Sequence, residues 1–379
     1  QYIKSALTDP KKLTVEVKNW YDFTNLNAYV LKWSIVGDNG KMLAKGEQSI
    51  EVAPHATTEV SLGGVRLPWN IREAYLNLSW TPKKKSAFIG TDDEVAYDHV
   101  CLDLPIDQYR PTLAKLSEKP EIQIDPKTGA LTSYIYEGQE YLASPVRLSL
   151  YRPATDNDNR EKKGGAKVWR KLGLNHLVQR VLSVKTSGHT TYSEVKLLND
   201  KNDTIGSATF EYTIRKDGIL SVQTRFVPDT TFVSSLARVG LVFEMPHSFN
   251  RVTYLGRGEH ETYADRKLSG RIGIYHTDAE RMFHYYVRPQ ATGNRTDVRW
   301  MQVSDELGKG LSVWGEKSFE FSVSPFTDEN IDAAGHINEL KRNGTVTVHL
   351  DALQSGVGTA TCGPGVTGAL FGACKRVSV

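Results

Sequence analysis

Two short clusters of carboxylates are the residues of this sequence whose spacing could carry out acid–base chemistry. They are Asp156-Asn157-Asp158 and Glu259-His260-Glu261. Two carboxyl groups can hydrolyse a glycosidic bond when one donates a proton and the other attacks or activates water. Side chains two residues apart in a strand point the same way, however, and need not flank a substrate. We favour polar turn chemistry with an Arg partner for Asp156 and Asp158, and keep open a hard cation such as Ca²⁺, which prefers several oxygens.

A second group of residues, between positions 254 and 314, is rich in Arg and aromatic side chains. Its members are Tyr254, Arg257, Tyr263, Arg266, Arg295, Arg299, Trp300 and Trp314. Aromatic faces stack on sugar rings, and polar side chains bind the sugar hydroxyls. The same residue types also suit Arg–aromatic packing inside a large sandwich. Both interpretations stay open at this point.

Motifs for metal, phosphate or serine-nucleophile chemistry do not occur. The sequence has no His-Glu-x-x-His, no paired Cys-x-x-Cys, no Gly-rich phosphate loop with Lys-Ser/Thr and no Gly-x-Ser-x-Gly turn. Its cysteines are Cys101, Cys362 and Cys374. Three cysteines could form one bridge at most, so we expect no disulfide framework.

The overall composition excludes several classes of protein. The 379 residues include 47 Lys+Arg and 44 Asp+Glu, a net charge of +3, which is no nucleic-acid signature. No stretch of about 18 apolar residues occurs, so we expect no membrane span. The chain opens at Gln1 without an initiator Met or an apolar signal core. We therefore expect that processing or cloning removed a segment upstream.

Residues 1–103 read as short strands. Apolar and polar residues alternate over 13–17, 28–36, 58–62 and 74–80, the pattern of strands buried on one face. The second of these runs ends at Asp38-Asn39-Gly40, a hairpin signal because Asn and Gly tolerate positive φ. These features predict a small β-sandwich.

The rest of the chain predicts a second, larger all-β body. Pro105, Pro111 and Pro120 punctuate a segment with no regular periodicity. We therefore predict a domain over 1–104, a linker over 105–120 and a domain over 121–379. Alternating runs recur in the last domain, at 178–184, 208–214, 220–227, 310–314 and 344–350. Strands without an internal linker predict one large antiparallel sandwich, with short helices at 166–172 and 328–340.

Four segments resemble the C-terminal domain of glycoside hydrolase family 2 β-galactosidases, in the same order and spacing. They are Arg-Pro-Ala-Thr-Asp-Asn-Asp at 152–158, the Gly-Arg-Gly…Tyr-Ala-Asp-Arg loop at 255–266, Pro-Gln…Gly-Asn-Arg-Thr-Asp-Val-Arg-Trp at 289–300 and the Gly-rich loop at 356–365. Residues 1–103 are similar to the immunoglobulin-like domain that precedes it, with residues 20–26 the best local match. The resemblance covers nearly the whole chain.

The resemblance implies that the chain is the C-terminal part of a retaining β-galactosidase acting on terminal β-D-galactosides. In the family, the two catalytic glutamates stand on a (β/α)₈ barrel. We expect that barrel upstream, no catalytic residue here and no activity of this chain alone. The large domain resembles the galactose-mutarotase-like supersandwich. The resemblance implies that it supports the barrel and supplies loops to the rim of the active site.

The resemblance also assigns residues to the substrate rim and to its support. The rim residues are Gly256, Arg257, Gly258, Glu261, Tyr263, Cys362 and Gly363. The supporting residues are Asp156, Asn157, Asp158, Arg295, Asp297, Arg299 and Trp300. Gly256 and Gly258 would supply the permissive backbone of a mobile loop.

This chain departs from the family pattern at several positions. Glu259 stands in place of a Pro, Thr262 in place of an Asn, and Ala291-Thr292 in place of Glu-Asn. Cys362 occupies the position where some relatives place a Trp that stacks on galactose, and a thiol offers no ring face. A β-galactoside is therefore the expected substrate, with another β-linked glycoside left open.

Cofactors, partners and two alternative functions complete the expectations. We expect no cofactor in this chain, since the family often binds Mg²⁺ or Na⁺ on the missing domains. The expected partners are the upstream barrel, a carbohydrate substrate and further copies of the chain in a homo-oligomer. The first alternative is a stand-alone carbohydrate-binding module. The second is an aldose 1-epimerase, which needs a His acid and a carboxylate base, but His176, His260 and His284 have no evident partner by spacing.

Overall fold

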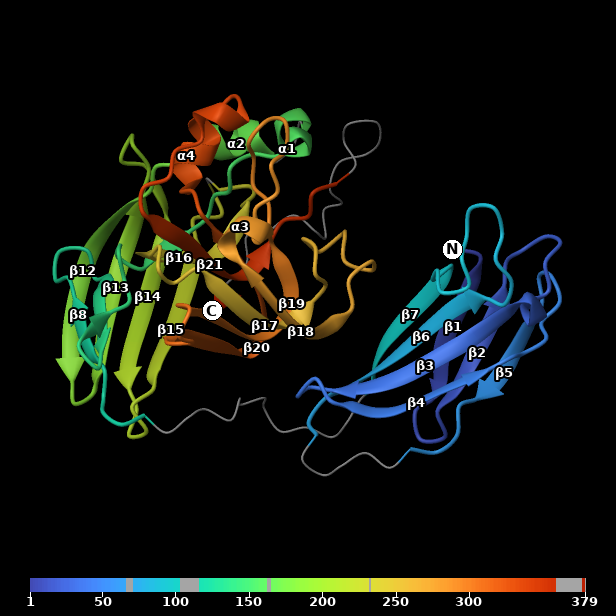
Figure 1. Cartoon of the computed structure of the whole chain (residues 1–379). Coiled ribbons are helices and arrows are strands. Elements are labelled where there is room, and N and C mark those ends of the chain that lie inside the picture. The colour runs from blue at the N-terminus through green and yellow to red at the C-terminus, as the bar shows by residue number, and fades with distance from the viewer. Residues whose placement is uncertain (66–70, 103–115, 162–164, 232, 359–376, 379) are drawn as a thin grey trace. The chain divides into compact units, whose positions relative to one another are not determined.

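A computed structural model describes the chain apart from residues 66–70, 103–115, 162–164, 232, 359–376 and 379 (Figure 1). Two compact units are present: Gln1–Tyr109 with Arg271–Ile274, and Arg110–Gly270 with Tyr275–Val379. The predicted all-β class is confirmed. Most of the predicted linker at 105–120 falls outside the described residues. The exact boundaries 1–104 and 121–379 stay predictions.

The first unit is a sandwich of a three-stranded and a four-stranded sheet. The three-stranded sheet has the order β1 (Ile3–Asp9), β2 (Thr14–Asn19), β5 (Thr57–Ser61). The four-stranded sheet has the order β4 (Met42–Gln48), β3 (Tyr29–Gly37), β6 (Ala74–Pro82), β7 (Ala96–Leu102), and η1 (Leu26–Ala28) precedes β3. The apolar positions of the alternating strands form one core that includes Val15, Val17, Leu31 and Trp80.

The hairpin between β3 and β4 forms where Asn39-Gly40 predicts it. Gly40 has φ +75°, the left-handed conformation that glycine adopts without strain. The Asn39 side-chain oxygen accepts a hydrogen bond from the backbone N–H of Lys41 at 3.0 Å. Across the core, Trp80 is fully buried and its indole N–H donates to the Ser5 hydroxyl at 3.1 Å. Both sheets are therefore fastened to one another by a buried polar contact as well as by apolar packing.

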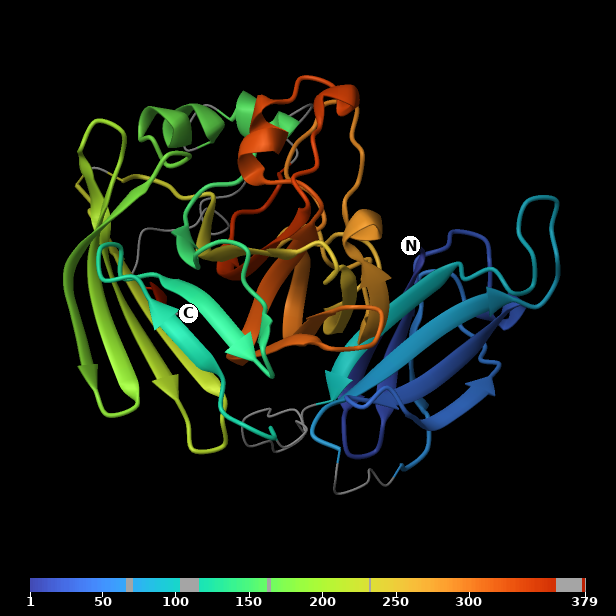
Figure 2. The same ribbon diagram turned by 60° about the vertical axis from the view of Figure 1, so that its left-hand side comes forward.

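The second unit contains sheets of seven, five and three strands (Figures 1 and 2). The seven-stranded sheet has the order β11 (Arg147–Ser149), β16 (Arg238–Pro246), β21 (Thr345–Gln354), β20 (Gly310–Ser324), β19 (Arg295–Ser304), β17 (Arg251–Arg257), β18 (Ile272–Asp278). The five-stranded sheet has the order β12 (Val178–Ser187), β13 (Thr190–Leu198), β14 (Thr204–Ile214), β15 (Leu220–Pro228), β22 (Val377–Ser378). The three-stranded sheet has the order β10 (Gln139–Glu140), β9 (Leu131–Tyr136), β8 (Glu121–Ile124).

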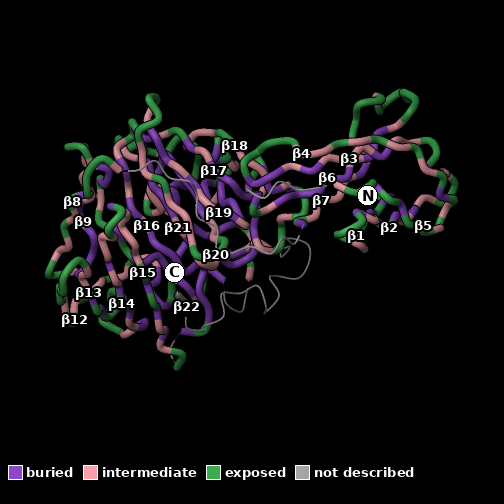
Figure 3. The backbone as a smooth tube through the Cα atoms, turned by 90° about the horizontal axis from the view of Figure 1, so that it is seen from below, coloured by how far each residue is buried: buried purple, intermediate pink, exposed green. Residues whose placement is uncertain are grey.

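The core of the second unit lies between these sheets (Figure 3). Leu197, Phe210 and Phe226 of the five-stranded sheet share one apolar cluster with Phe321 and Val348 of the seven-stranded sheet. Strands β12 to β15 pair antiparallel in sequence order, as expected for hairpin-connected strands. The prediction of one large antiparallel sandwich is therefore confirmed in its class.

The helices are short, and α1 (Asp156–Arg160), α2 (Ala166–Lys171) and α4 (Asp328–Ala333) gather at one end of the second unit. The predicted helix at 166–172 is confirmed as α2. The predicted helix at 328–340 is wrong in length, because α4 ends at Ala333 and only the 3₁₀ turn η2 (Ile337–Glu339) follows. Gly335 lies in the break, and its N–H donates to the Glu339 side chain at 2.8 Å instead of continuing the helix. No helix of the described residues is long and apolar enough to cross a membrane.

Candidate functional site

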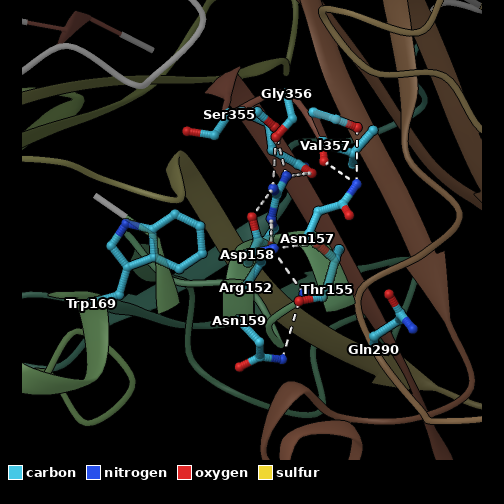
Figure 4. Close-up of polar contacts among 12 residues, drawn as sticks. Arg152, Thr155, Asn157, Asp158, Asn159, Trp169, Gln290, Ser355, Gly356 and Val357 are labelled. Carbon is cyan, nitrogen blue, oxygen red and sulfur yellow. Dashed lines mark hydrogen bonds and ion pairs between the residues drawn. The ribbon is translucent and has the colours of Figure 1, made fainter. Parts of the chain in front are cut away.

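Arg152 is the centre of a buried polar network in the second unit (Figure 4). Its side chain is 0% exposed, and its Nε and Nη2 donate to both oxygens of Asp158 at 3.0 and 2.8 Å. Its Nη1 and Nη2 also donate to the carbonyl oxygens of Ser355 and Gly356 at 2.6 and 2.9 Å, and Nη1 donates to Gln354 Oε1 at 3.1 Å. A planar guanidinium can satisfy this many acceptors at once, which an ammonium group cannot.

The first turn of α1 fixes the position of the Asp158 side chain that pairs with Arg152. Thr155 caps the helix: its hydroxyl accepts the Asp158 N–H at 3.1 Å, and Asp158 Oδ2 accepts the Thr155 N–H at 2.9 Å. This is a capping box with Asp at the third position. Arg152 therefore occupies both oxygens of Asp158, while Asp156 is exposed and its backbone N–H donates to the Gln290 side chain at 3.1 Å. Asp158 therefore has the turn and the Arg partner that we favoured, and the cation alternative stays a prediction.

Asn157 extends the network to the segment that leads into the predicted Gly-rich loop. Its side-chain Nδ2 donates to the carbonyl oxygens of Val357 and Gly358 at 2.8 and 2.9 Å. Together with Arg152 it fixes the backbone of residues 355–358. The two predicted rim residues beyond this segment, Cys362 and Gly363, lie outside the described residues.

Glu261 is the centre of a second group of hydrogen bonds. The carboxylate is 9% exposed and accepts from five groups. These are the hydroxyls of Tyr263 (3.2 Å), Thr292 (2.7 Å) and Tyr286, the N–H of Gly293 (3.0 Å) and Nη1 of Arg266 (3.1 Å). Burial would raise the pKa of Glu261, but the hydrogen bonds from Tyr286, Thr292 and Gly293 outweigh burial and lower it.

The Glu259–Glu261 pair does not form an acid–base couple. Glu259 is exposed, whereas the Glu261 carboxylate is buried and fully engaged. The ring of Tyr263, itself 2% exposed, lies 6.0 Å from the Arg152 guanidinium. The buried side chains of Glu261 and Tyr263 therefore stabilise the loop 256–266. Their assignment to the substrate rim stays a prediction.

Arg295 joins the third predicted segment to the second. It is 2% exposed, and its Nε donates to the Tyr254 hydroxyl at 2.9 Å. Its Nη1 donates to the carbonyl oxygen of Gly293 at 2.9 Å, and its Nη2 to that of Glu259 at 2.6 Å. The Arg–aromatic packing that the sequence left open is thus realised at this position.

Asp297 lies among three cationic side chains. Its carboxylate accepts from Arg257 Nε at 2.6 Å and from Lys267 Nζ at 3.3 Å, while its carbonyl oxygen accepts from Arg299 at 2.5 Å. Burial would raise the pKa of Asp297, but Arg257 and Lys267 lower it overall. Its φ of +53° is a left-handed conformation that Asp tolerates better than most residues.

Gly256 and Gly258, the two glycines of the predicted mobile loop, are required for different structural reasons. A Cβ on Gly256 would meet Val298 Cγ2 at 2.8 Å, so Gly256 allows close strand packing. Gly258 has φ +69°, which requires glycine for conformational reasons. Trp300 lies further along β19, paired with Leu255 and Trp314. Trp300 is therefore placed within the sheet, and its supporting role stays a prediction.

The sequence did not reveal a charged cluster formed by residues of β16, β21 and α4. Arg238 Nη1 contacts His349 Nδ1, Arg238 Nε lies 3.5 Å from Asp351 Oδ2, and His349 Nε2 lies 3.2 Å from Asp328 Oδ1. Burial raises the pKa of Asp351. Partial burial would also raise the pKa of Asp328, but His349 and Arg238 lower it overall. The one sequence feature that could have indicated this cluster is the run of polar residues at alternate positions of β21. Among the described residues, no group of three His, Cys, Asp or Glu side chains could hold a metal ion.

Glu320 of β20 is a further residue that the sequence did not reveal. Its carboxylate accepts from Asn294 Nδ2 at 2.6 Å, and Asp351 is its cross-strand neighbour. Burial, against the opposing hydrogen bond from Asn294, raises the pKa of Glu320 to about 7, and repulsion from Asp351 and Asp297 adds to this. The folded chain therefore holds a proton here that the unfolded chain releases near its ordinary pKa of 4.5.

The variant Glu320→Gln is expected to be more stable than the wild type at pH 8 by about 2 kcal/mol. The gain should grow as the pH rises from about 4.5 to about 7 and stay constant above that, because over this range the unfolded chain releases a proton that the folded chain retains. Gln keeps an acceptor for Asn294. Urea denaturation of both proteins at pH 4.5 and pH 8 measures the difference. Equal midpoints at pH 8 would contradict the raised pKa.

Comparisons with known proteins show the family to which the chain belongs. A model of the β-galactosidase small chain matches residues 117–372, and a model of β-galactosidase domain 4 matches residues 15–103. The chain therefore belongs to the β-galactosidase small-chain family, and the sequence-based resemblance is confirmed. It is 30% identical over 375 residues to a β-galactosidase of Priestia megaterium and 24% identical over 372 residues to one of Actinobacillus pleuropneumoniae. It aligns over 94% and 92% of its own length but spans only 36% of each of these relatives.

Proposed function

We propose that this chain is the C-terminal, non-catalytic part of a retaining β-galactosidase that hydrolyses terminal β-D-galactosides. Family membership supports the proposal, as do relatives named β-galactosidase of whose length the chain spans 36%. The catalytic acids belong to the upstream barrel. Any Mg²⁺ or Na⁺ that the parent protein uses is assigned by this proposal to the upstream domains.

One observation carries the proposal: four segments distant in sequence meet in one connected set of contacts. Arg152 comes from the first segment. It binds Gly356, the first residue of the fourth segment, and Ser355, which directly precedes it. Glu261 comes from the second and accepts from Thr292 of the third. These contacts support a role in which the network holds two loops at the rim of the upstream active site. The first is the loop from 256 to 266, and the second is the segment 355–358, which precedes Cys362 and Gly363 in the sequence.

The isolated 379-residue chain is expected to show no turnover of a chromogenic β-galactoside above the buffer rate. Activity should appear when the upstream barrel is joined to it, and the first product should be the β-anomer of galactose, because a retaining mechanism inverts twice. NMR of the fresh product measures the anomer. Turnover by the isolated chain well above background would contradict the proposal.

Calorimetry on the same isolated chain tests the alternative of a carbohydrate-binding module. The proposal predicts no saturable heat with galactose or lactose, because the principal contacts to the sugar come from the barrel. Saturable binding below about 1 mM would favour the binding module instead.

A further inference from the structure

The carboxylate of Asp265 binds the backbone of a segment 92 residues away in sequence. Oδ1 accepts the N–H of Val357 at 3.0 Å, and Oδ2 accepts the N–H of Gly358 at 2.7 Å. Gly358 has φ +61°. Two successive N–H groups that converge on one anion, with a left-handed residue at the second, form an anion-binding nest. Here the anion is a side chain of the same protein.

A tight turn fixes Asp265 on its own side of this contact. Tyr263 and Arg266 exchange two backbone hydrogen bonds, from Tyr263 N–H to Arg266 O at 3.1 Å and from Arg266 N–H to Tyr263 O at 2.9 Å. Tyr263 is buried, and Arg266 donates to Glu261. Asp265 therefore projects from a turn whose two ends are held.

The segment 355–358 is held along both of its polar edges. Asn157 and Arg152 bind its carbonyl oxygens, whereas Asp265 binds its N–H groups. The backbone of Gly356 packs directly against the Asp265 carboxylate. A Cβ on Gly356 would overlap both oxygens of the carboxylate and lie 2.5 Å from its Cγ. Only glycine at 356 allows this approach.

We propose that Asp265 is a positioning residue that couples the turn Tyr263–Arg266 to the segment 355–358, so that a displacement of either displaces the other. The coupling itself is a property of this chain, whereas its consequence for a substrate rim rests on the proposed function. Coupling between two sites is reciprocal. Removing the hydrogen bonds that Asn157 donates to Val357 and Gly358 should therefore also loosen the turn Tyr263–Arg266.

The test is amide hydrogen exchange, resolved by residue, on the 379-residue chain. In Asp265→Ala the amides of Val357 and Gly358 should exchange about tenfold faster, as expected for loss of a charge-assisted hydrogen bond. In Asn157→Ala the amides of Tyr263 and Arg266 should exchange about threefold faster, because the loosened segment no longer holds Asp265 in place. Asn159→Ala is the matched control, because Asn159 lies on the same helix and its amide donates to Thr155 O.

Gly356→Ala gives a second route that removes no hydrogen-bonding group. The added methyl should push the flexible Asp265 side chain aside and reproduce the faster exchange at Val357 and Gly358. Gly335→Ala is its control, because a Cβ there meets nothing closer than 3.6 Å.

Two results would overturn the coupling. One is unchanged exchange at Val357 and Gly358 in both Asp265→Ala and Gly356→Ala. The other is unchanged amide exchange at Tyr263 and Arg266 in Asn157→Ala while exchange at Val357 and Gly358 becomes faster. That result would show that Asn157 and Asp265 bind the segment independently. Neither readout depends on glycosidase activity. An inactive or differently specific parent protein would therefore leave the coupling standing, and a failed exchange test would leave the proposed function standing.

Discussion

The variant Arg152→Met is expected to lower the free energy of unfolding of the second unit by about 3–5 kcal/mol. It leaves the Asp158 carboxylate, 4% exposed, without its cationic partner. It also removes the donors to the Ser355 and Gly356 carbonyl oxygens and to Gln354. Each buried acceptor that loses its donor keeps the full desolvation penalty. Urea denaturation followed by tryptophan fluorescence measures the change, since Trp169 lies 5.7 Å from the guanidinium.

Arg342→Met is the matched control for this experiment. Arg342 also forms an ion pair, with Glu280, but the two side chains are 50% and 38% exposed. Exposed pairs contribute about 0–1 kcal/mol, so the control should change little. The double variant Arg152→Met/Asp158→Asn should recover part of the loss, because it removes the unpaired buried charge. A loss in Arg152→Met no larger than in Arg342→Met would contradict the central role given to the network.

The period of two in the sequence predicts the strands well, because burial of one face is a local property of a strand. The alternation over 28–36 corresponds to β3 (Tyr29–Gly37), and that over 178–184 lies within β12 (Val178–Ser187). The error at 328–340 has a local cause as well. Apolar spacing continues past Ala333, but Gly335 has a weak helix propensity and its N–H has a competing acceptor in Glu339.

The polar contacts were far less predictable, because they depend on which loops the sheets bring together. Arg152 binds Ser355 across 203 residues, and Asp265 binds Val357 across 92. No spacing rule relates such positions, since the register of several strands must be known first. The family resemblance supplied the segments but not their partners. It named Glu261 and Tyr263, for example, but not the hydrogen bonds that Glu261 accepts from Thr292 and Gly293.

The second large effect is expected for Glu261→Gln, which should destabilise the second unit by about 2–4 kcal/mol. The carboxylate accepts from five donors, including the N–H of Gly293 and the Thr292 hydroxyl. A Gln side chain turns one acceptor oxygen into an NH₂ group that faces those donors. The loss should concentrate in the loop around Glu261, where hydrogen exchange measures it. Thermal denaturation measures the global change.

The pH dependence of this loss separates the charge of Glu261 from its shape. The pKa of Glu261 in the fold lies below its ordinary value of 4.5. Its contribution is therefore present in full above about pH 4.5 and is lost as the pH falls through the lower, folded pKa. The difference between wild type and Glu261→Gln should be constant from pH 6 to 8 and shrink in acid. Glu259→Gln, two residues away and exposed, should show no such difference. A gap that persists unchanged into acid would mean that the ionised carboxylate is not what holds the loop.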